Sequence, residues 1–138
     1  MKTVMCFGTF DILHLGHLYY FEQAKKHGDY LIVVIARDET KKKQKKKVIF
    51  TERERLKVVQ SLKVVDEAVL GKVGDHLQIV LEKKPDILCL GYDQKINEKE
   101  LQRRLAEKDF HPKIIRINPY QAKYQKSKKI KKLLFNEI

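Results

Sequence analysis

Two histidines, His14 and His17, are the residues of this sequence best suited to carry chemistry. They follow a short apolar run and the segment Gly8-Thr9-Phe10-Asp11. A spacing of three residues places both imidazoles on one face of the first turn of a helix, where both can donate N–H groups to one polyphosphate. A helix start also offers free backbone N–H groups and a positive dipole. The segment therefore predicts a phosphate-binding site.

Two glycines beside the histidines fit the same interpretation. Gly8, at the end of the apolar run, allows the backbone to approach a ligand closely, and Gly16 allows close packing against the helix. A single histidine in such a place is more often a core or surface residue. Two histidines at this spacing, just beyond a predicted strand, favour a ligand site.

Basic residues supply further candidates. Arg55 begins the inward-facing stripe of a predicted helix, and a charged side chain on such a stripe needs an anionic partner. That partner is either a substrate phosphate or a neighbouring carboxylate. The segment 41–47 holds six lysines in seven positions. These lysines repel one another unless an anion is present, so we expect a mobile loop in which most lysines are simply solvated.

Composition limits the classes of protein. The chain has 138 residues and 43% hydrophobic residues, enough for one domain, 1–138, with its own core. Its 30 basic and 18 acidic residues give a net charge of +12, which favours an anionic partner. No apolar run is long enough to span a membrane, so we expect a cytoplasmic protein. Cys6 and Cys89 lie in apolar runs and are interpreted as buried thiols, in neither a disulfide nor a metal site.

Strand and helix patterns alternate along the chain, which predicts an α/β domain with a parallel sheet. The residues that must position the site lie where these elements meet, beyond the carboxyl ends of the strands. Five strands are predicted, at 4–7, 30–36, 64–70, 87–90 and 113–117. Helices are predicted at 13–26, 51–62, 75–83, 98–108 and 127–135, the second of them opened by a capping box from Thr51 to Glu54.

The segment Gly8-Thr9-Phe10-Asp11 with His14-Leu15-Gly16-His17 resembles the signature of the cytidylyltransferase-like nucleotidyltransferases. The resemblance implies a Rossmann-like domain with helices on both faces of the sheet. It also implies transfer of a nucleotidyl group from a nucleoside triphosphate to a phosphate-bearing acceptor, with release of pyrophosphate. His14 and His17 would stabilise charge at the α-phosphate by alignment and charge alone. Mg²⁺ would accompany the triphosphate, held mainly by phosphate oxygens and water rather than by a protein metal site.

Other parts of the family pattern match less closely. A lysine of the loop would fold over the phosphates, and Lys46 is the best match, with Lys45 and Lys47 as competitors. Arg55 lies where an arginine contacts phosphate in glycerol-3-phosphate cytidylyltransferases. The Ser/Thr-rich turn that opens the family's last helix is reduced here to Ser127, which would hold the β- or γ-phosphate or act as a plain helix cap. The resemblance thus implies His14, His17, Lys46 and Arg55 as catalytic, and as nucleotide-binding Gly8, Thr9, Phe10, Asp11, Gly16, Asp93 and Ser127.

Within the superfamily, the segments 36–40, 62–71 and 84–94 are most similar to the archaeal-type FAD synthases. That likeness implies ATP and FMN as substrates, FAD and pyrophosphate as products, and a homodimer. Asp93, just after the fourth predicted strand, would lie near the base or ribose, or would cap its own loop as an Asx-turn residue. The alternative is a glycerol-3-phosphate cytidylyltransferase, which uses CTP and glycerol 3-phosphate.

A basic nucleic-acid-binding module is the alternative from another class. The net charge of +12 and the lysine run favour it. The sequence offers neither an aromatic platform nor a nucleic-acid motif, which disfavours it. His14→Ala separates the two hypotheses, because it should abolish pyrophosphate release and leave charge-driven binding of nucleic acid nearly intact.

Overall fold

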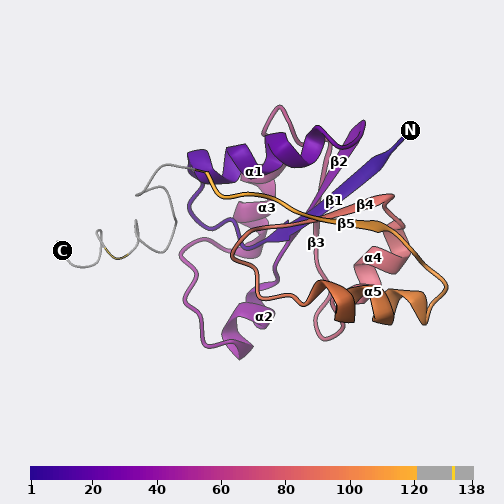
Figure 1. Ribbon diagram of the computed structural model, residues 1–138. Helices are drawn as coiled ribbons and strands as arrows, with labels where there is room; N and C mark the ends of the chain where they lie inside the picture. Colours follow the sequence, from indigo (N-terminus) through magenta and orange to yellow (C-terminus); the bar gives the residue numbers. More distant parts are fainter. Residues whose placement is uncertain (121–131, 133–138) are drawn as a thin grey trace.

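Five parallel strands form one sheet in the computed structural model, which describes residues 1–120 and 132 (Figure 1). The strand order is β3-β2-β1-β4-β5. The strands are β1 (Thr3–Gly8), β2 (Tyr30–Ile35), β3 (Glu67–Leu70), β4 (Ile87–Leu90) and β5 (Lys113–Arg116). The helices are α1 (Leu15–Lys25), α2 (Asp38–Lys43), α3 (Glu52–Gln60), α4 (Leu77–Lys83) and α5 (Glu98–Ala106). The predicted α/β architecture is confirmed.

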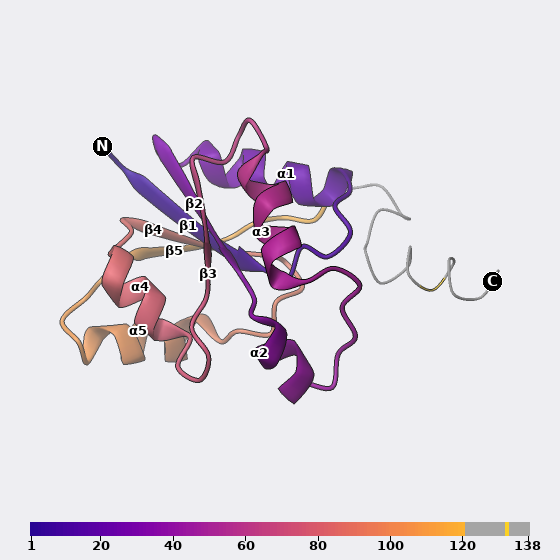
Figure 2. The same ribbon diagram turned by 180° about the vertical axis from the view of Figure 1, so that it is seen from behind.

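Helices cover both faces of the sheet, as the two opposite views show (Figures 1 and 2). On one face, Phe21 of α1 and Val59 of α3 pack against buried residues of the sheet such as Val33. On the other face, Val80 of α4 and Leu105 of α5 join a second buried cluster. The central strands β1, β2 and β4 are therefore covered on both sides, which explains why their sequences are continuously apolar.

Cys6 and Cys89 face each other across the sheet. They are register partners on β1 and β4, both are fully buried, and both are free thiols. Burial raises the pKa of the Cys6 thiol well above its ordinary value and that of the Cys89 thiol to about 12. The predicted burial of both thiols is confirmed.

The structure corrects several predicted boundaries. α1 begins at Leu15 rather than at residue 13, because His14 is its N-cap. β3 begins at Glu67 rather than at residue 64, after a turn in which the N–H of Val65 donates to the carbonyl of Leu62. The predicted last helix, 127–135, lies outside the described residues.

The lysine run is not wholly a loop, which corrects a further prediction. Its first three lysines, 41–43, form the last turn of α2. Asp38 and Glu39 occupy the first turn of the same helix, so the charges at both ends complement the helix dipole. Among the described residues, no helix is both long and apolar enough to cross a membrane.

Candidate active site

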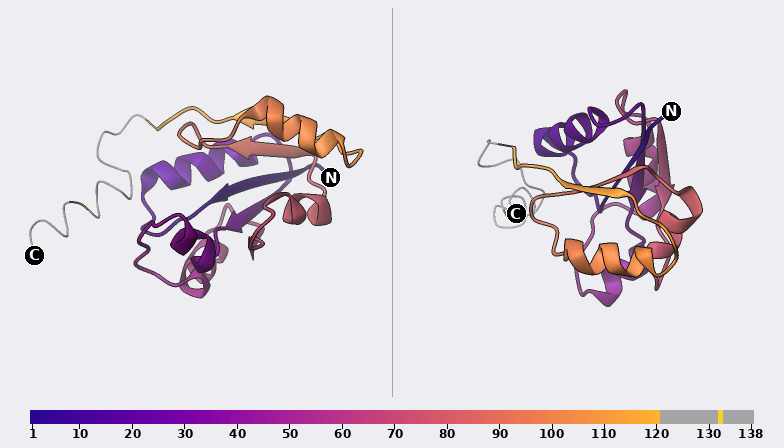
Figure 3. Two further views of the ribbon diagram at one scale, coloured as in Figure 1. Left: turned by 90° about the horizontal axis from the view of Figure 1, so that it is seen from below. Right: turned by 45° about the vertical axis from the view of Figure 1, so that its right-hand side comes forward.

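The site begins where the carboxyl ends of neighbouring strands meet. β1 lies at the centre of the sheet. The chain first adds β2 and β3 on one side of it and then adds β4 and β5 on the other side, so the direction of winding reverses at β1. Ligands of such sheets bind in the crevice outside the strand ends at this switch point. A view turned by 90° shows the start of α1, the short α2 and the segment that follows α2 gathered toward the same end of the molecule (Figure 3).

Residues at these strand ends line a cavity of about 160 Å³. Gly8 and Thr9 form part of its wall at the end of β1, and Arg37 does so just after β2. Arg37 and two further basic residues of this wall, Lys72 and His76, were not predicted as site residues. The signal for Arg37 was its position directly after a buried strand, on the edge where such sheets place their ligands.

The two histidines hold each other in place at the start of α1. The Nδ1 atom of His14 accepts a hydrogen bond from the N–H of Gly16 (3.1 Å), and the Nδ1 atom of His17 accepts one from the N–H of His14 (3.3 Å). Their rings lie 3.9 Å apart between centroids at an interplanar angle of 29°. Because both Nδ1 atoms accept, a neutral ring carries its proton on Nε2. The structure thus brings the predicted pair together as two Nε2–H donors.

The surroundings keep both rings neutral. Burial lowers the pKa of His14, and burial together with neighbouring His14 lowers the pKa of His17 to about 3. The Nε2 atom of His14 is the single buried side-chain nitrogen or oxygen in the described part of the chain without a hydrogen-bond partner. A buried donor without a partner is costly, and an oxygen of a bound ligand would satisfy it.

Phe10 packs against the histidine pair through the ring of His17. Its backbone has a φ of 54°, and its ring is buried and meets the ring of His17 edge to face, with centroids 5.4 Å apart. The same ring covers Gly8, where a Cβ atom would lie 2.4 Å from Cζ of Phe10. The predicted nucleotide-binding residue Phe10 is therefore a core side chain that fills the space a side chain at position 8 would need.

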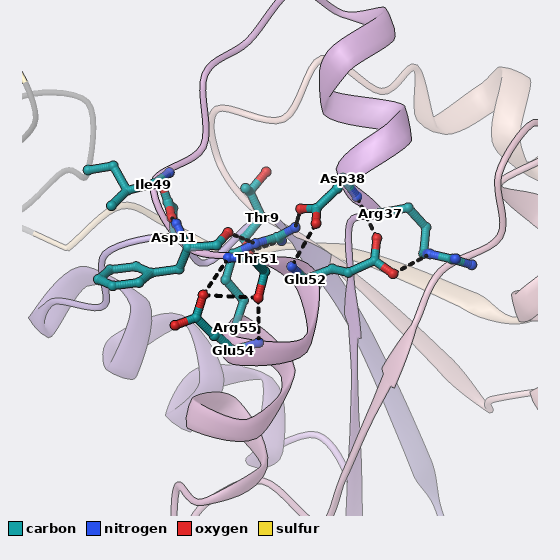
Figure 4. Close-up of polar contacts among 10 residues, drawn as sticks. Thr9, Asp11, Arg37, Asp38, Ile49, Thr51, Glu52, Glu54 and Arg55 are labelled. Atoms are coloured by element: carbon teal, nitrogen blue, oxygen red, sulfur yellow. Dashed lines mark hydrogen bonds and ion pairs between the residues drawn. The ribbon is translucent and has the colours of Figure 1, made fainter.

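Arg55 is fully buried and its three kinds of nitrogen all donate within the protein (Figure 4). Nη1 donates to the carbonyl of Thr9 (2.7 Å), Nε to the carbonyl of Phe50 (3.1 Å) and Nη2 to Oδ1 of Asp38 (2.8 Å). Burial alone would raise the pKa of Asp38, but the hydrogen bonds from the Glu52 N–H and Arg55 lower it. The carboxylate partner considered for Arg55 is thus present, and Arg55 fixes the backbone of the loop after β1.

Asp11 also faces the protein. Its carboxylate is buried and accepts from the N–H of Ile49 at Oδ2 (2.8 Å) and from the N–H of Phe50 at Oδ1 (2.9 Å), as Figure 4 shows. These residues follow the lysine run. Asp11 and Arg55 therefore tie the loop before α1 to the segment that leads into α3.

Lys46 and Asp93 are exposed. Lys46 lies beside a second cavity, of about 270 Å³, between α2 and the segment 48–51. Asp93 lies in the turn after β4, and it is the neighbouring Gln94 that binds this turn to β1, by donating from Nε2 to the carbonyl of Phe7 (2.6 Å). Gly16 lies in the first turn of α1. Ser127 lies outside the described residues.

The part of the chain that the structure describes holds no set of side chains that could bind a metal ion by themselves. No group of three histidine, cysteine, aspartate or glutamate side chains gathers there. Both histidine Nδ1 atoms and both oxygens of Asp11 are already engaged with backbone N–H groups. A divalent cation would fit this site only as a companion of bound phosphates.

A comparison with known protein families shows to which family the chain belongs. A family model described as cytidylyltransferase-like matches residues 5–133. The chain belongs to the cytidylyltransferase-like family. It is a nucleotidyltransferase, as the resemblance of the histidine motif predicted. A module that only binds nucleic acid is set aside by this membership.

Members of this family among the curated proteins are similar over the whole chain. An FAD synthase of Thermoplasma volcanium is 46% identical over 138 residues, which cover 100% of this chain and 97% of the relative. An FAD synthase of Thermoplasma acidophilum is 45% identical with the same coverage. A crystal structure from Thermoplasma volcanium, described as a lipopolysaccharide core biosynthesis protein, superposes with a TM-score of 0.86 at 50% identity. It covers 88% of this chain and 99% of its own. The predicted likeness to the FAD synthases is confirmed.

Proposed function

We propose that this nucleotidyltransferase is an FAD synthase that transfers AMP from ATP to FMN. The proposal is supported by the full-length similarity to proteins named FAD synthase and by the paired imidazoles at the carboxyl edge of β1. The observation that carries the chemistry is the buried and unpartnered Nε2 of His14 beside the ring of His17. Two neutral imidazole donors with stacked rings suit an anionic oxygen whose charge grows during the reaction.

The reaction needs no covalent intermediate with the protein. A phosphate oxygen of FMN forms a bond to the α-phosphorus of ATP, the bond from that phosphorus to the bridging oxygen breaks, and pyrophosphate leaves with the electron pair. His14 and His17 donate from Nε2 to the oxygens of the α-phosphate and the leaving group. Their low pKa values keep them as neutral donors in the empty enzyme, so they bring hydrogen bonds rather than full charges.

Other residues of this chain would hold and orient the nucleotide. Gly8 and Thr9 line the strand-end cavity, and Arg55 holds the carbonyl of Thr9 by a hydrogen bond. Lys46 would supply positive charge to the phosphates from the segment between α2 and α3. Asp93 would lie beside the base or ribose at the end of β4. Mg²⁺, held by phosphate oxygens and water, would neutralise the triphosphate and improve pyrophosphate as a leaving group.

The test is pyrophosphate release in the presence of Mg²⁺. ATP with FMN is compared with CTP and glycerol 3-phosphate, and the His17→Ala variant gives the background. Release that requires both ATP and FMN, with formation of FAD, supports the proposal. Release that requires CTP and glycerol 3-phosphate would instead assign the cytidylyltransferase reaction, and release with neither pair would contradict both.

A homodimer and a cytoplasmic location complete the proposal. Both follow from the likeness to the FAD synthases. Light scattering during size-exclusion chromatography tests the first, with a mass near twice 16.3 kDa as the expected result.

A further inference from the structure

Two large apolar residues stand exposed beside the second cavity. Ile49 exposes 44% and Phe50 exposes 43% of its surface, directly before α3. They line the cavity of about 270 Å³ together with lysines of α2 and of the loop after it, Lys41, Lys42 and Lys46. Covering exposed apolar surface with a ligand lowers the free energy of the system. Apolar and cationic side chains side by side are therefore typical of a binding site.

Hydrogen bonds with buried side chains hold the backbone at these two exposed residues. Asp11 is only 6% exposed and spends both carboxylate oxygens on the N–H groups of Ile49 and Phe50. The carbonyl of Phe50 accepts from the buried Arg55. Buried charges are retained only where hydrogen bonds compensate them. These contacts therefore fix the backbone from which the two apolar side chains project.

The charge of the cavity defines one end of the occupant. Asp38 is the one carboxylate in its wall, and it already pairs with Arg55 and accepts from the N–H of Glu52. Lys42 and Lys46 therefore bring positive charge to the same wall. An occupant that matches both features carries an anionic group and a flat apolar part.

Asp11 links two residues of the cavity wall to the loop that leads to the histidine pair. Asp11, which holds Ile49 and Phe50, precedes His14 by three residues. The segment 48–51 leads into Glu52, which exchanges hydrogen bonds with Asp38 just after β2. The switch point between β1 and β4 lies on the other side of β1 and suits the nucleotide. The cavity is therefore placed to serve the second substrate, the acceptor.

We propose that Ile49 and Phe50 form an apolar platform on which the planar ring of the acceptor lies, while the lysines beside it and the histidine pair receive its phosphate. This inference rests on the proposed function, since FMN joins a flat ring system to a phosphomonoester. It assigns acceptor specificity to two side chains outside the histidine motif.

Binding of flavins to the full chain tests the platform. The fluorescence anisotropy of FMN and of riboflavin, which has the same ring and no phosphate, is titrated with the unmodified protein and two variants. Phe50→Ala is expected to weaken both flavins about tenfold, because stacking on an aromatic side chain is lost. Lys46→Gln is expected to weaken FMN and to leave riboflavin within about twofold.

Matched controls come from α3. Val58 exposes 52% of its surface and Lys57 is exposed, and neither lines the cavity. Val58→Ala and Lys57→Gln should bind both flavins as the unmodified protein does. In steady-state kinetics, Phe50→Ala should raise the KM for FMN about tenfold and leave kcat and the KM for ATP within about twofold.

Unchanged affinity for FMN in Phe50→Ala would overturn the platform. A second measurement needs no substitution: FMN should shift the amide resonances of Ile49 and Phe50 in the unmodified protein. Shifts confined to Gly71, Lys72 and His76 would overturn the platform and place the acceptor in the strand-end cavity. Loss of a dimer in Phe50→Ala with unchanged FMN affinity would show that a second copy covers these residues.

The platform and the proposed function fail in different ways. If the protein forms FAD while Phe50→Ala keeps the unmodified KM for FMN, the platform is wrong and the function stands. If the unmodified protein releases no pyrophosphate from ATP with FMN, the proposed function itself is wrong.

Discussion

Asp38 and Glu52 cap each other's helices. The N–H of Asp38, at the start of α2, donates to Oε1 of Glu52 (2.7 Å), and the N–H of Glu52, at the start of α3, donates to Oδ2 of Asp38 (3.0 Å). Arg37 adds an ion pair to Glu52 (3.1 Å). This exchange fixes α2, which carries the first lysines of the run, relative to α3.

Glu52→Ala should lower the free energy of unfolding by about 1–2 kcal/mol, because α2 loses its cap and Arg37 loses its partner. Urea denaturation followed by circular dichroism measures the change. Glu39→Ala, on the same helix, is the control. Glu39 makes an exposed pair with Lys43 (3.7 Å), so its removal should cost below about 0.5 kcal/mol. Equal effects of the two substitutions would deny the exchange of caps any special weight.

His14→Ala should lower kcat by a factor of about 10²–10³, since one donor to the transition state is lost. His14→Gln should recover part of that loss, because its amide can place an N–H near the position of Nε2. His27 is exposed and follows α1, so His27→Ala serves as the control and should keep full activity. Pyrophosphate release measures all three, and an active His14→Ala would remove this residue from the site.

Acid should destabilise the protein through His17. The pKa of His17 is lowered from 6.5 to about 3 by burial and by His14, so the unfolded chain binds the proton first as the pH falls. The free energy of unfolding therefore falls as the pH drops below 6.5 and continues to fall toward pH 3, by at most about 1.4 kcal/mol per pH unit. His17→Gln should lose stability less steeply over this range. Parallel pH profiles of the two proteins would contradict the lowered pKa.

Arg55→Lys should cost about 3–5 kcal/mol of unfolding free energy. A lysine cannot reach the carbonyls of Thr9 and Phe50 and the carboxylate of Asp38 together, and the groups left unpaired are buried. Arg53→Lys, on the exposed face of the same helix, should change stability by less than about 0.5 kcal/mol. A small effect of Arg55→Lys would show that the guanidinium can be replaced by a point charge.

Gly8→Ala should destabilise the protein by about 1–3 kcal/mol, because the new Cβ would lie 2.4 Å from the ring of Phe10. The ring of Phe10 is buried against the rings of His17 and Phe21, which leaves it little freedom to move aside. Phe10→Leu should therefore cost less in the Gly8→Ala background than alone, which a double-mutant cycle in urea reveals. Strict additivity would indicate that the ring escapes the clash by another route.

Much of the fold could be predicted because its signals are local. Runs such as 31–35 are apolar without interruption, as strands buried on both faces must be. The histidine pair was found because its spacing and its place after a strand are visible in the sequence. α2 was missed because six lysines resemble a solvated loop, although Asp38 and Glu39 before them are the charges a helix start prefers.

The rest of the site depends on contacts distant in sequence. Nothing near Asp11 indicates that its carboxylate holds two N–H groups 38 and 39 residues away. The partners of Arg55 lie up to 46 residues from it, so the choice between phosphate and carboxylate could not be made from its helix alone. The proton position on each imidazole likewise follows from hydrogen bonds that only the folded cap creates.

Cys6 and Cys89 can report when the centre of the sheet opens. Both thiols are fully buried, and their raised pKa values keep them protonated at neutral pH, whereas thiolates are the species that react with labelling reagents. Labelling must wait until β1 and β4 separate. The rate of thiol modification in the unmodified protein therefore reports the opening of β1 from β4. Substrates that bind the folded form should slow this modification, and those that bind more tightly should slow it more.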